Sequence, residues 1–361
     1  MVNRVVNGLS EEIRILEKLS NAFGPPGNEE DVREILREEL EGHADEVKVD
    51  KLGNIFFYHH GKEGYPKVML TAHMDEVGLM ITYIEAFMEE NGFLRFHTLG
   101  GIASSLLPGQ VVLLKGTKGF VKGIIGMKPP HLLKEEERKK VLPVEELFID
   151  IGVGSPEEAM ERGIEIGTTG VFDFQFTELG GGYVMGKAFD DRVGCTVLVQ
   201  VFKVLKDSPY NLVAVGTVQE EVGLRGARTA AWQVEPDYAL ALEGTFAGDV
   251  PGTKPHRMSA RLKRGPVITI ADRTTITHPT ILKTLIRLGR EKSIPFQFKK
   301  IPSGGTDAGA IHLTKAGVPS GTVAVPCRYI HGPAAITYID DLRNTISLVK
   351  EFVKAISMTY G

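Results

Sequence analysis

The chain has 361 residues, 42% hydrophobic and 24% charged, and its 42 Lys and Arg against 46 Asp and Glu give a formal net charge of −4. This composition is too apolar for a disordered protein, and the near-neutral balance argues against a dedicated nucleic-acid-binding protein. The two cysteines, Cys195 and Cys327, exclude a disulfide framework and a Cys-type zinc finger and fit a reducing compartment.

The N-terminal part predicts two helices followed by strands. Helical spacing of apolar residues is seen over 10–23 and again over 28–42, with a Gly-Pro-Pro-Gly break between them. Residues 47–61 alternate like a strand hairpin, and 68–73 form a short apolar strand. The first helix brings acidic residues before any signal-type apolar core, and no apolar run reaches the roughly 18 residues of a membrane span. We therefore expect a cytoplasmic chain with no membrane partner.

Residues 80–178 have a different pattern. Short β-like runs alternate there with Gly and Pro turns, which favours a small barrel or sandwich. Within it, the charged and Pro-interrupted residues 128–140 predict an exposed, mobile loop. The pattern indicates a β-rich insertion between the two parts of one domain, 1–79 and 179–361.

After residue 178 the alternation of helices and strands returns. Helices are expected over 190–205, 277–292 and 342–356, and strands over 212–219, 237–244 and 324–332. Such alternation predicts an α/β sheet with helices on both faces. The ends of strands in an open α/β sheet line the ligand crevice, so polar residues at these ends are the candidate functional residues.

The first candidates are His73 and Asp75, which follow the strand at 68–73. Because they are two residues apart, both side chains leave an extended chain on one face, and a carboxylate beside an imidazole is typical of metal-binding histidines. The alternative is a surface His and Asp in a loop, which the spacing alone favours.

The next candidates are carboxylates. Asp190 and Asp191 begin an apolar helix, where Asp is also a common N-cap, so taken alone the pair favours a cap. Glu220 and Glu221 end a buried strand, where two adjacent carboxylates repel unless a cation or a proton intervenes. For them a functional site and solvated charge are equally supported.

Two further strand ends carry Glu243 and His331, and each is weak evidence in isolation. The segment Ser303–Asp307 precedes a helix and allows backbone to approach a ligand closely, but it lacks the GK[ST] ending of a phosphate-binding loop.

These residues form one set that suits divalent metal ions. Histidines and carboxylates without cysteine favour Zn²⁺, Co²⁺ or Mn²⁺. A pair of divalent ions balances the charge of Asp190, Glu221, Glu243 and a bridging hydroxide, and it leaves Glu220 to handle protons. A single ion would leave much of that negative charge uncompensated.

Six motifs, in the order AHMDEVG, GKAFDDRVG, QEEVGLRGA, ALEGT, SGGTDAGAI and RYIHGP, resemble those of the dinuclear metalloaminopeptidases of the tetrahedral (TET) type. That family includes glutamyl and deblocking aminopeptidases, and the resemblance covers nearly the whole chain. It implies a zinc-exopeptidase-like three-layer α/β catalytic domain with an inserted small β-barrel that mediates dimerisation. It also implies a homo-oligomer in which dimers assemble into tetrahedral dodecamers, with two divalent metal ions per subunit, Zn²⁺ or Co²⁺.

The resemblance also implies a role for each residue. His73 and Glu243 become ligands of one metal, Glu221 and His331 ligands of the other, and Asp190 the carboxylate that bridges both. Asp75 orients His73, and Glu220 is the general base that takes a proton from water. The adjacent Asp191 is the alternative bridge, and Glu243 departs from the family because Asp is expected at its position.

The activity implied is the release of N-terminal amino acids from peptides. One alternative is a related dinuclear carboxypeptidase or deacylase, for which Arg192, Arg225, Arg228 and Arg328 are available to bind a substrate carboxylate. Another is a degenerate, non-catalytic shell or peptide-binding protein, which only the unusual Glu243 suggests. An endoglucanase activity is disfavoured because such enzymes use metal-free carboxylates and aromatic platforms, and the chain has one Trp.

Overall fold

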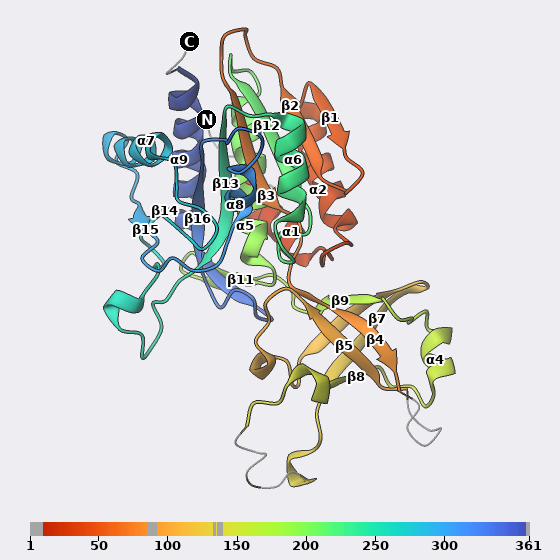
Figure 1. Cartoon of the computed structure of the whole chain (residues 1–361). Coiled ribbons are helices and arrows are strands. Elements are labelled where there is room, and N and C mark those ends of the chain that lie inside the picture. Colours follow the sequence, from red (N-terminus) through yellow and green to blue (C-terminus); the bar gives the residue numbers. More distant parts are fainter. Residues whose placement is uncertain (1–9, 86–91, 133–134, 136–139, 359–361) are drawn as a thin grey trace. The chain divides into compact units, whose positions relative to one another are not determined.

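A computed structural model of the protein describes residues 10–85, 92–132, 135 and 140–358 (Figure 1). The chain forms two compact units. The smaller unit contains Glu76–Phe174 together with His331–Pro333, and the larger unit contains the remainder. The boundaries between the two units follow residues 75 and 174. The sequence predicts these boundaries four residues later, after 79 and 178. The loop expected at 128–140 lies in part outside the described residues.

A mixed sheet organises the larger unit, with eleven strands among the described residues. Its four central strands are parallel: β12 (Asn211–Thr217), β3 (Lys67–His73), β13 (Tyr238–Phe246) and β16 (Ser320–Arg328). Beyond β12 the antiparallel hairpin of β2 (Ile55–His59) and β1 (Glu46–Val49) completes one side. Beyond β16 the strands are β17 (Ala335–Tyr338), β11 (Tyr183–Gly186) and β10 (Thr177–Gly180), while β14 (Val267–Thr269) pairs with both β16 and β15 (Gln297–Phe298).

Both faces of this sheet are covered, which gives three layers (Figure 1). Side chains alternate along a strand, so Val68 and Leu70 of β3 pack into one core and Met69 packs into the other. The helices of the larger core are α1 (Glu11–Asn21), α2 (Glu30–Leu40), α5 (Phe189–Leu205), α7 (Pro279–Glu291) and α9 (Ile339–Met358). Those of the opposite core are α6 (Arg225–Val234) and α8 (Asp307–Ile311). The predicted α/β class is confirmed.

Helix α7 illustrates how local sequence sets these elements. The His278 side chain accepts a hydrogen bond from the Thr280 N–H, and Pro279 occupies the first turn, where its missing N–H has no cost. Ile281, Leu285 and Leu288 follow at helical spacing and are buried. Burying each such side chain contributes about 1.5–3 kcal/mol, which fixes the face that packs on the sheet.

The smaller unit is a closed barrel with strand order β4-β5-β8-β7-β6-β9. The strands are β4 (Gly78–Ile84), β5 (Leu94–Leu99), β6 (Val111–Gly116), β7 (Gly119–Gly126), β8 (Phe148–Asp150) and β9 (Thr169–Phe172). The short helix α4 (Pro156–Glu161) is capped by Ser155, whose side chain accepts from the Glu158 N–H. Each strand of the barrel pairs with two neighbours, and the interior is filled by apolar side chains such as Leu79, Leu94 and Ile149.

The parallel strands place their carboxyl ends at one edge of the large sheet. Strand β3 ends at His73, β12 ends three residues before Glu220, and Glu243 lies in the second half of β13. Strand β16 ends three residues before His331. Among the described residues, no helix is long and apolar enough to cross a membrane.

Candidate active site

His73 lies at the centre of a cluster of carboxylates. It is 1% exposed, and its Nε2 lies 3.4 Å from Asp190 Oδ1, 3.5 Å from Glu243 Oε2 and 4.0 Å from Glu220 Oε2. Its Nδ1 lies 3.0 Å from the Asp75 backbone oxygen. A carbonyl oxygen only accepts, so Nδ1 carries a proton, and Nε2 faces the carboxylate oxygens, where its lone pair would be available to a bound cation. Such an arrangement of a buried imidazole has the form of a metal ligand.

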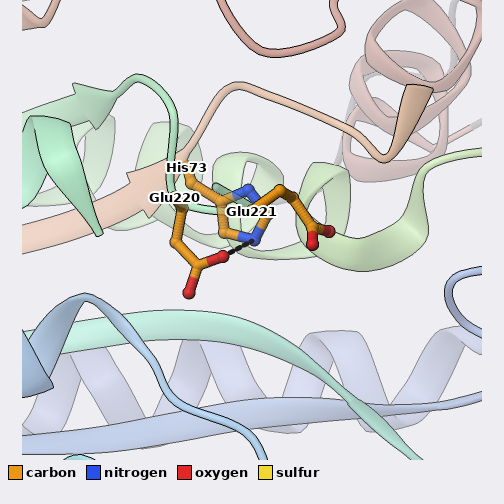
Figure 2. A group of neighbouring side chains, drawn as sticks. All are labelled: His73, Glu220 and Glu221. Carbon is orange, nitrogen blue, oxygen red and sulfur yellow. Dashed lines mark ion pairs between the residues drawn. The ribbon is translucent and has the colours of Figure 1, made fainter. Parts of the chain in front are cut away.

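Asp75 fixes the backbone of the two adjacent glutamates. Its carboxylate is fully buried, with Oδ1 accepting from the Glu220 N–H at 2.9 Å and Oδ2 accepting from the Glu221 N–H at 3.0 Å. Ligand atoms of His73, Glu220 and Glu221 all lie within 4.8 Å of one another. Figure 2 shows the Glu220 carboxylate beside the His73 ring, with the Glu221 carboxylate pointing away from it.

The two adjacent aspartates at the start of α5 differ in what they contact. Asp191 is fully buried, and its carboxylate accepts backbone N–H groups from His73 at 3.2 Å and from Gly194 at 2.9 Å. Asp190 instead directs Oδ1 to the His73 Nε2. A carboxylate oxygen of Asp190 also lies within 4.8 Å of one of Glu221. Both Asp191 oxygens are thus engaged by backbone N–H groups. One of them also lies within 4.8 Å of ligand atoms of His73 and Glu243, so both aspartates border the carboxylate cluster.

The charge of this cluster fits bound cations. Burial raises the pKa of Glu243 well above its ordinary value, and Asp191 adds to this shift. Burial also raises the pKa of Glu220, which Glu221 raises further. Opposing burial, Asp190 and Asp75 raise the pKa of His73. Buried carboxylates at this spacing repel one another, and imidazole nitrogen with carboxylate oxygen is the donor set that divalent Zn²⁺ or Co²⁺ takes.

His331 belongs to the short segment counted with the barrel unit. Its Nδ1 lies 2.9 Å from the backbone oxygen of Gly101, which again places the proton on Nδ1 and leaves Nε2 as the acceptor nitrogen. Its φ of +58° is in the left-handed region. Along the chain, two residues separate it from the end of β16.

Two acidic residues beside the site are not singled out by the sequence. Glu29 is 3% exposed and accepts from the N–H of Gln219, whose φ of +57° directs the chain into Glu220. Asp307 is 1% exposed and accepts from the Thr217 hydroxyl at 2.6 Å. Glu29 is one of several acidic residues at a helix start, and Asp307 follows a Gly-rich turn. Only the tertiary pairing distinguishes them.

Comparison with known proteins defines the family. Residues 53–348 match the family of M42 glutamyl aminopeptidases. The chain belongs to this family.

Two aminopeptidases are similar to this chain along nearly its whole length. A putative aminopeptidase of Acetivibrio thermocellus is 39% identical over 94% of this chain and 97% of its own. The lysyl aminopeptidase of Pyrococcus furiosus is 32% identical over 94% and 96%.

Solved structures of TET peptidases have the same fold. A TET aminopeptidase from a marine sediment archaeon of the Thaumarchaeota superposes with a TM-score of 0.90 at 40% identity, covering 96% of this chain and 99% of that one. The TET1 peptidase of Pyrococcus horikoshii, which can assemble into a tetrahedron or a large octahedral shell, gives 0.83 at 34% identity over 95% and 99%.

These findings confirm the predicted fold class and the predicted enzyme class. The M42 chain described here is a metal-dependent aminopeptidase, a hydrolase of peptide bonds. Its membership favours this class over the carboxypeptidase, deacylase and non-catalytic alternatives.

Proposed function

We propose that the chain binds two divalent ions, Zn²⁺ or Co²⁺, and releases N-terminal amino acids with Glu220 as the general base. His73 and Glu243 would hold one ion, Glu221 and His331 the other, and Asp190 would bridge the two. The observation that carries this proposal is the His73 Nε2, which lies within 4.0 Å of carboxylate oxygens of Asp190, Glu243 and Glu220. When bound, the ions would lower the pKa of a water and polarise the scissile carbonyl.

The chain's own groups supply proton transfer and orientation. Glu220 accepts the proton of the attacking water on a carboxylate oxygen and returns it to the leaving amine, so one group acts as base and then as acid. The raised pKa of Glu220, caused first by burial, suits a group that must hold a proton between these two events. Asp75 keeps Glu220 in place through the N–H it accepts at 2.9 Å.

The choice of Asp190 over Asp191 as the bridge is supported by hydrogen bonding. Both oxygens of Asp191 accept from backbone N–H groups, whereas Asp190 directs Oδ1 to His73. Glu243 stands where Asp is expected, yet its Oε2 lies 3.5 Å from the His73 Nε2. The longer side chain therefore reaches the same cluster.

The substrates would be peptides with a free α-amine, since an amine can occupy a metal position that a blocked N-terminus cannot. We also propose a homo-oligomer in which the barrel unit makes the dimer contact and dimers form a tetrahedral dodecamer. The TET1 peptidase of Pyrococcus horikoshii supports this, because it assembles into closed shells. Two buried free cysteines fit the reducing cytoplasm that we propose as the compartment.

The Glu220→Gln variant tests the proposed base. The amide keeps the size of the side chain but cannot take the water proton, so activity on aminoacyl-nitroanilides should fall by about 10²–10⁴-fold while bound metal per chain is unchanged. Glu235→Gln is the control, because Glu235 is exposed and pairs only with Lys315 among the contacts described. Near-normal turnover in Glu220→Gln would show that Glu220 is not the general base.

The His331→Ala variant tests the proposed ligand set. Bound metal per chain should fall, and an unchanged metal content by elemental analysis would show that His331 is not a ligand.

A further inference from the structure

The loop between β13 and β14 carries a dense group of basic residues that the proposed chemistry does not use. Its segment 254–264, KPHRMSARLKR, contains no acidic residue. Part of it lines a groove of about 460 Å³, whose other wall comes from residues 295–300. The cationic side chains that line this groove are Arg261, Lys263, Arg264 and Lys300, and its lining includes no carboxylate.

The basic side chains of this groove make no ion pair within the described part of the chain, although the carboxylates of Asp249 and Asp341 accept backbone N–H groups of the same segment. Among the described residues, none of Arg261, Arg264 and Lys300 makes an ion pair, in contrast to Arg328, which binds Asp249 through two nitrogens at 2.9 and 2.7 Å. The Lys263 ammonium lies over the ring of Tyr183 at 4.6 Å from its centroid. That contact positions the ammonium but does not neutralise it.

The groove is built rather than being a chance cluster of surface charge. Gln297 fixes the chain around Arg261, because its side chain accepts from the Arg261 N–H at 2.9 Å and donates to the Arg261 backbone oxygen at 2.8 Å. Asp341 fixes the following turn, because its two carboxylate oxygens accept from the Lys263 N–H and the Gly265 N–H, both at 2.7 Å.

The position of the groove relates it to the substrate. The loop begins after Phe246, the last residue of β13, and the Gly248 N–H donates to the Ala260 backbone oxygen at 3.0 Å, which places Ala260 of the groove beside Gly248. Because an extended chain spans at most about 3.6 Å per residue, the Cα atoms of Gly248 and Glu243 are no more than roughly 18 Å apart. A peptide bound with its N-terminus near Glu243 covers this distance by about its sixth residue.

We propose that this groove binds carboxylates of the peptide substrate downstream of the cleaved residue, so that the enzyme prefers peptides with acidic residues several positions after the N-terminus. This inference rests on the proposed aminopeptidase function. Basic groups that carry no structural ion pair and are held on a fixed backbone match an acidic side chain or a C-terminal carboxylate. The preference concerns only the downstream part of the peptide and is independent of the N-terminal residue.

The test uses metal-loaded enzyme and pairs of ten-residue peptides with the same N-terminal residue. One peptide of each pair carries Glu at positions six to nine, and the other carries Gln there. The wild type should cleave the Glu peptide with a kcat/KM about fivefold higher at low salt, since each exposed ion pair changes an equilibrium by less than tenfold. The Arg261→Gln/Arg264→Gln variant should lose this discrimination and keep its turnover of aminoacyl-nitroanilides. The control Lys283→Gln/Arg290→Gln, with the same charge change on exposed positions of α7, should behave as the wild type.

A binding measurement provides a readout without turnover. Fluorescence polarisation of the labelled Glu peptide on metal-loaded Glu220→Gln should show a weaker affinity when the two groove arginines are also replaced. Discrimination that persists in the groove variant would overturn the proposal, as would a wild type that hydrolyses aminoacyl-nitroanilides but treats both peptides alike. Binding of inorganic phosphate with no binding of the Glu peptide would also overturn it. If the metal-loaded wild type hydrolyses no aminoacyl-nitroanilide, the proposed function itself is contradicted.

Discussion

The Asp75 carboxylate accepts the Glu220 N–H at 2.9 Å, which joins the turn after β3 to the turn after β12. Its other oxygen accepts the Glu221 N–H. One fully buried side chain thus positions both glutamates and contacts the ring of His73 at 3.5 Å.

Asp75→Asn is expected to reduce kcat by about 10–100-fold. An amide has only one acceptor oxygen, so one of the two N–H groups loses its partner and the Glu220–Glu221 turn loosens. Bound metal should fall as well, as measured by elemental analysis of dialysed protein. The control is Asp237→Asn, which changes an exposed contact with the Lys67 N–H. Wild-type kcat in Asp75→Asn would show that the two hydrogen bonds do not position the glutamates.

Gly194→Ala is expected to destabilise the protein by about 2–4 kcal/mol. A Cβ at this position would lie 2.3 Å from Asp191 Oδ1 and 2.4 Å from Oδ2. Neither oxygen can move freely, because Asp191 is buried and accepts backbone N–H groups. Urea denaturation measures the change, and Gly42→Ala, where nothing lies within 4 Å of the added Cβ, is the neutral control. Equal stability of the two variants would contradict this packing.

The buried carboxyl of Glu29 should make the free energy of unfolding decrease as the pH rises from mildly acidic to neutral. Burial raises its pKa from 4.5 to about 7, although the Gly27 N–H lowers it. A group whose pKa is raised by folding contributes stability below pH 4.5, and this contribution is lost as pH rises to about 7. Glu29→Gln should flatten the pH dependence of the free energy of unfolding in that window. An unchanged slope would contradict the raised pKa.

The ion-paired carboxylate of Glu39 should have the opposite effect, so that the free energy of unfolding decreases as the pH falls into the acidic range. Burial opposes ionisation, but Arg14 and Lys203 lower the pKa of Glu39 to about 2, with nitrogens at 3.0 and 2.7 Å from its oxygens. The contribution is present above pH 4.5 and is lost as pH falls toward 2. Glu39→Gln should therefore lower stability at pH 7 by about 1–3 kcal/mol and narrow the difference from wild type below pH 3. A constant difference across this range would refute the assignment.

Much of the fold could be predicted because its patterns are local. The apolar run before His73 and the helix after Asp191 depend on residues within one element, and both are found as expected. The shorter strands β14 and β15 and the Ala-rich helix α6 are not predicted, because only tertiary packing stabilises them.

The residues of the candidate site could be predicted only in part from the sequence. His73 ends β3 and Glu220 follows β12 by three residues, so their positions after apolar runs mark them. Glu243 is expected at a strand end but lies inside β13, which continues to Phe246. Glu29 and Asp307 contact the same turns but come from elements far away in the sequence. The hydrogen bonds that separate Asp191 from Asp190 are likewise tertiary, so no spacing rule could assign them.

The insertion of the barrel has a consequence for synthesis of the chain. Strand β3 ends at residue 73, but its strand partners are β12, which begins at 211, and β13, which begins at 238. At translation rates of about 5–20 residues per second, roughly 7 to 28 seconds pass before the first residue of a partner strand is synthesised. During that time its apolar segment has unpaired edges, a hazard for aggregation. The nascent N-terminal segment is thus the part of this enzyme that a ribosome-associated chaperone would be expected to shield.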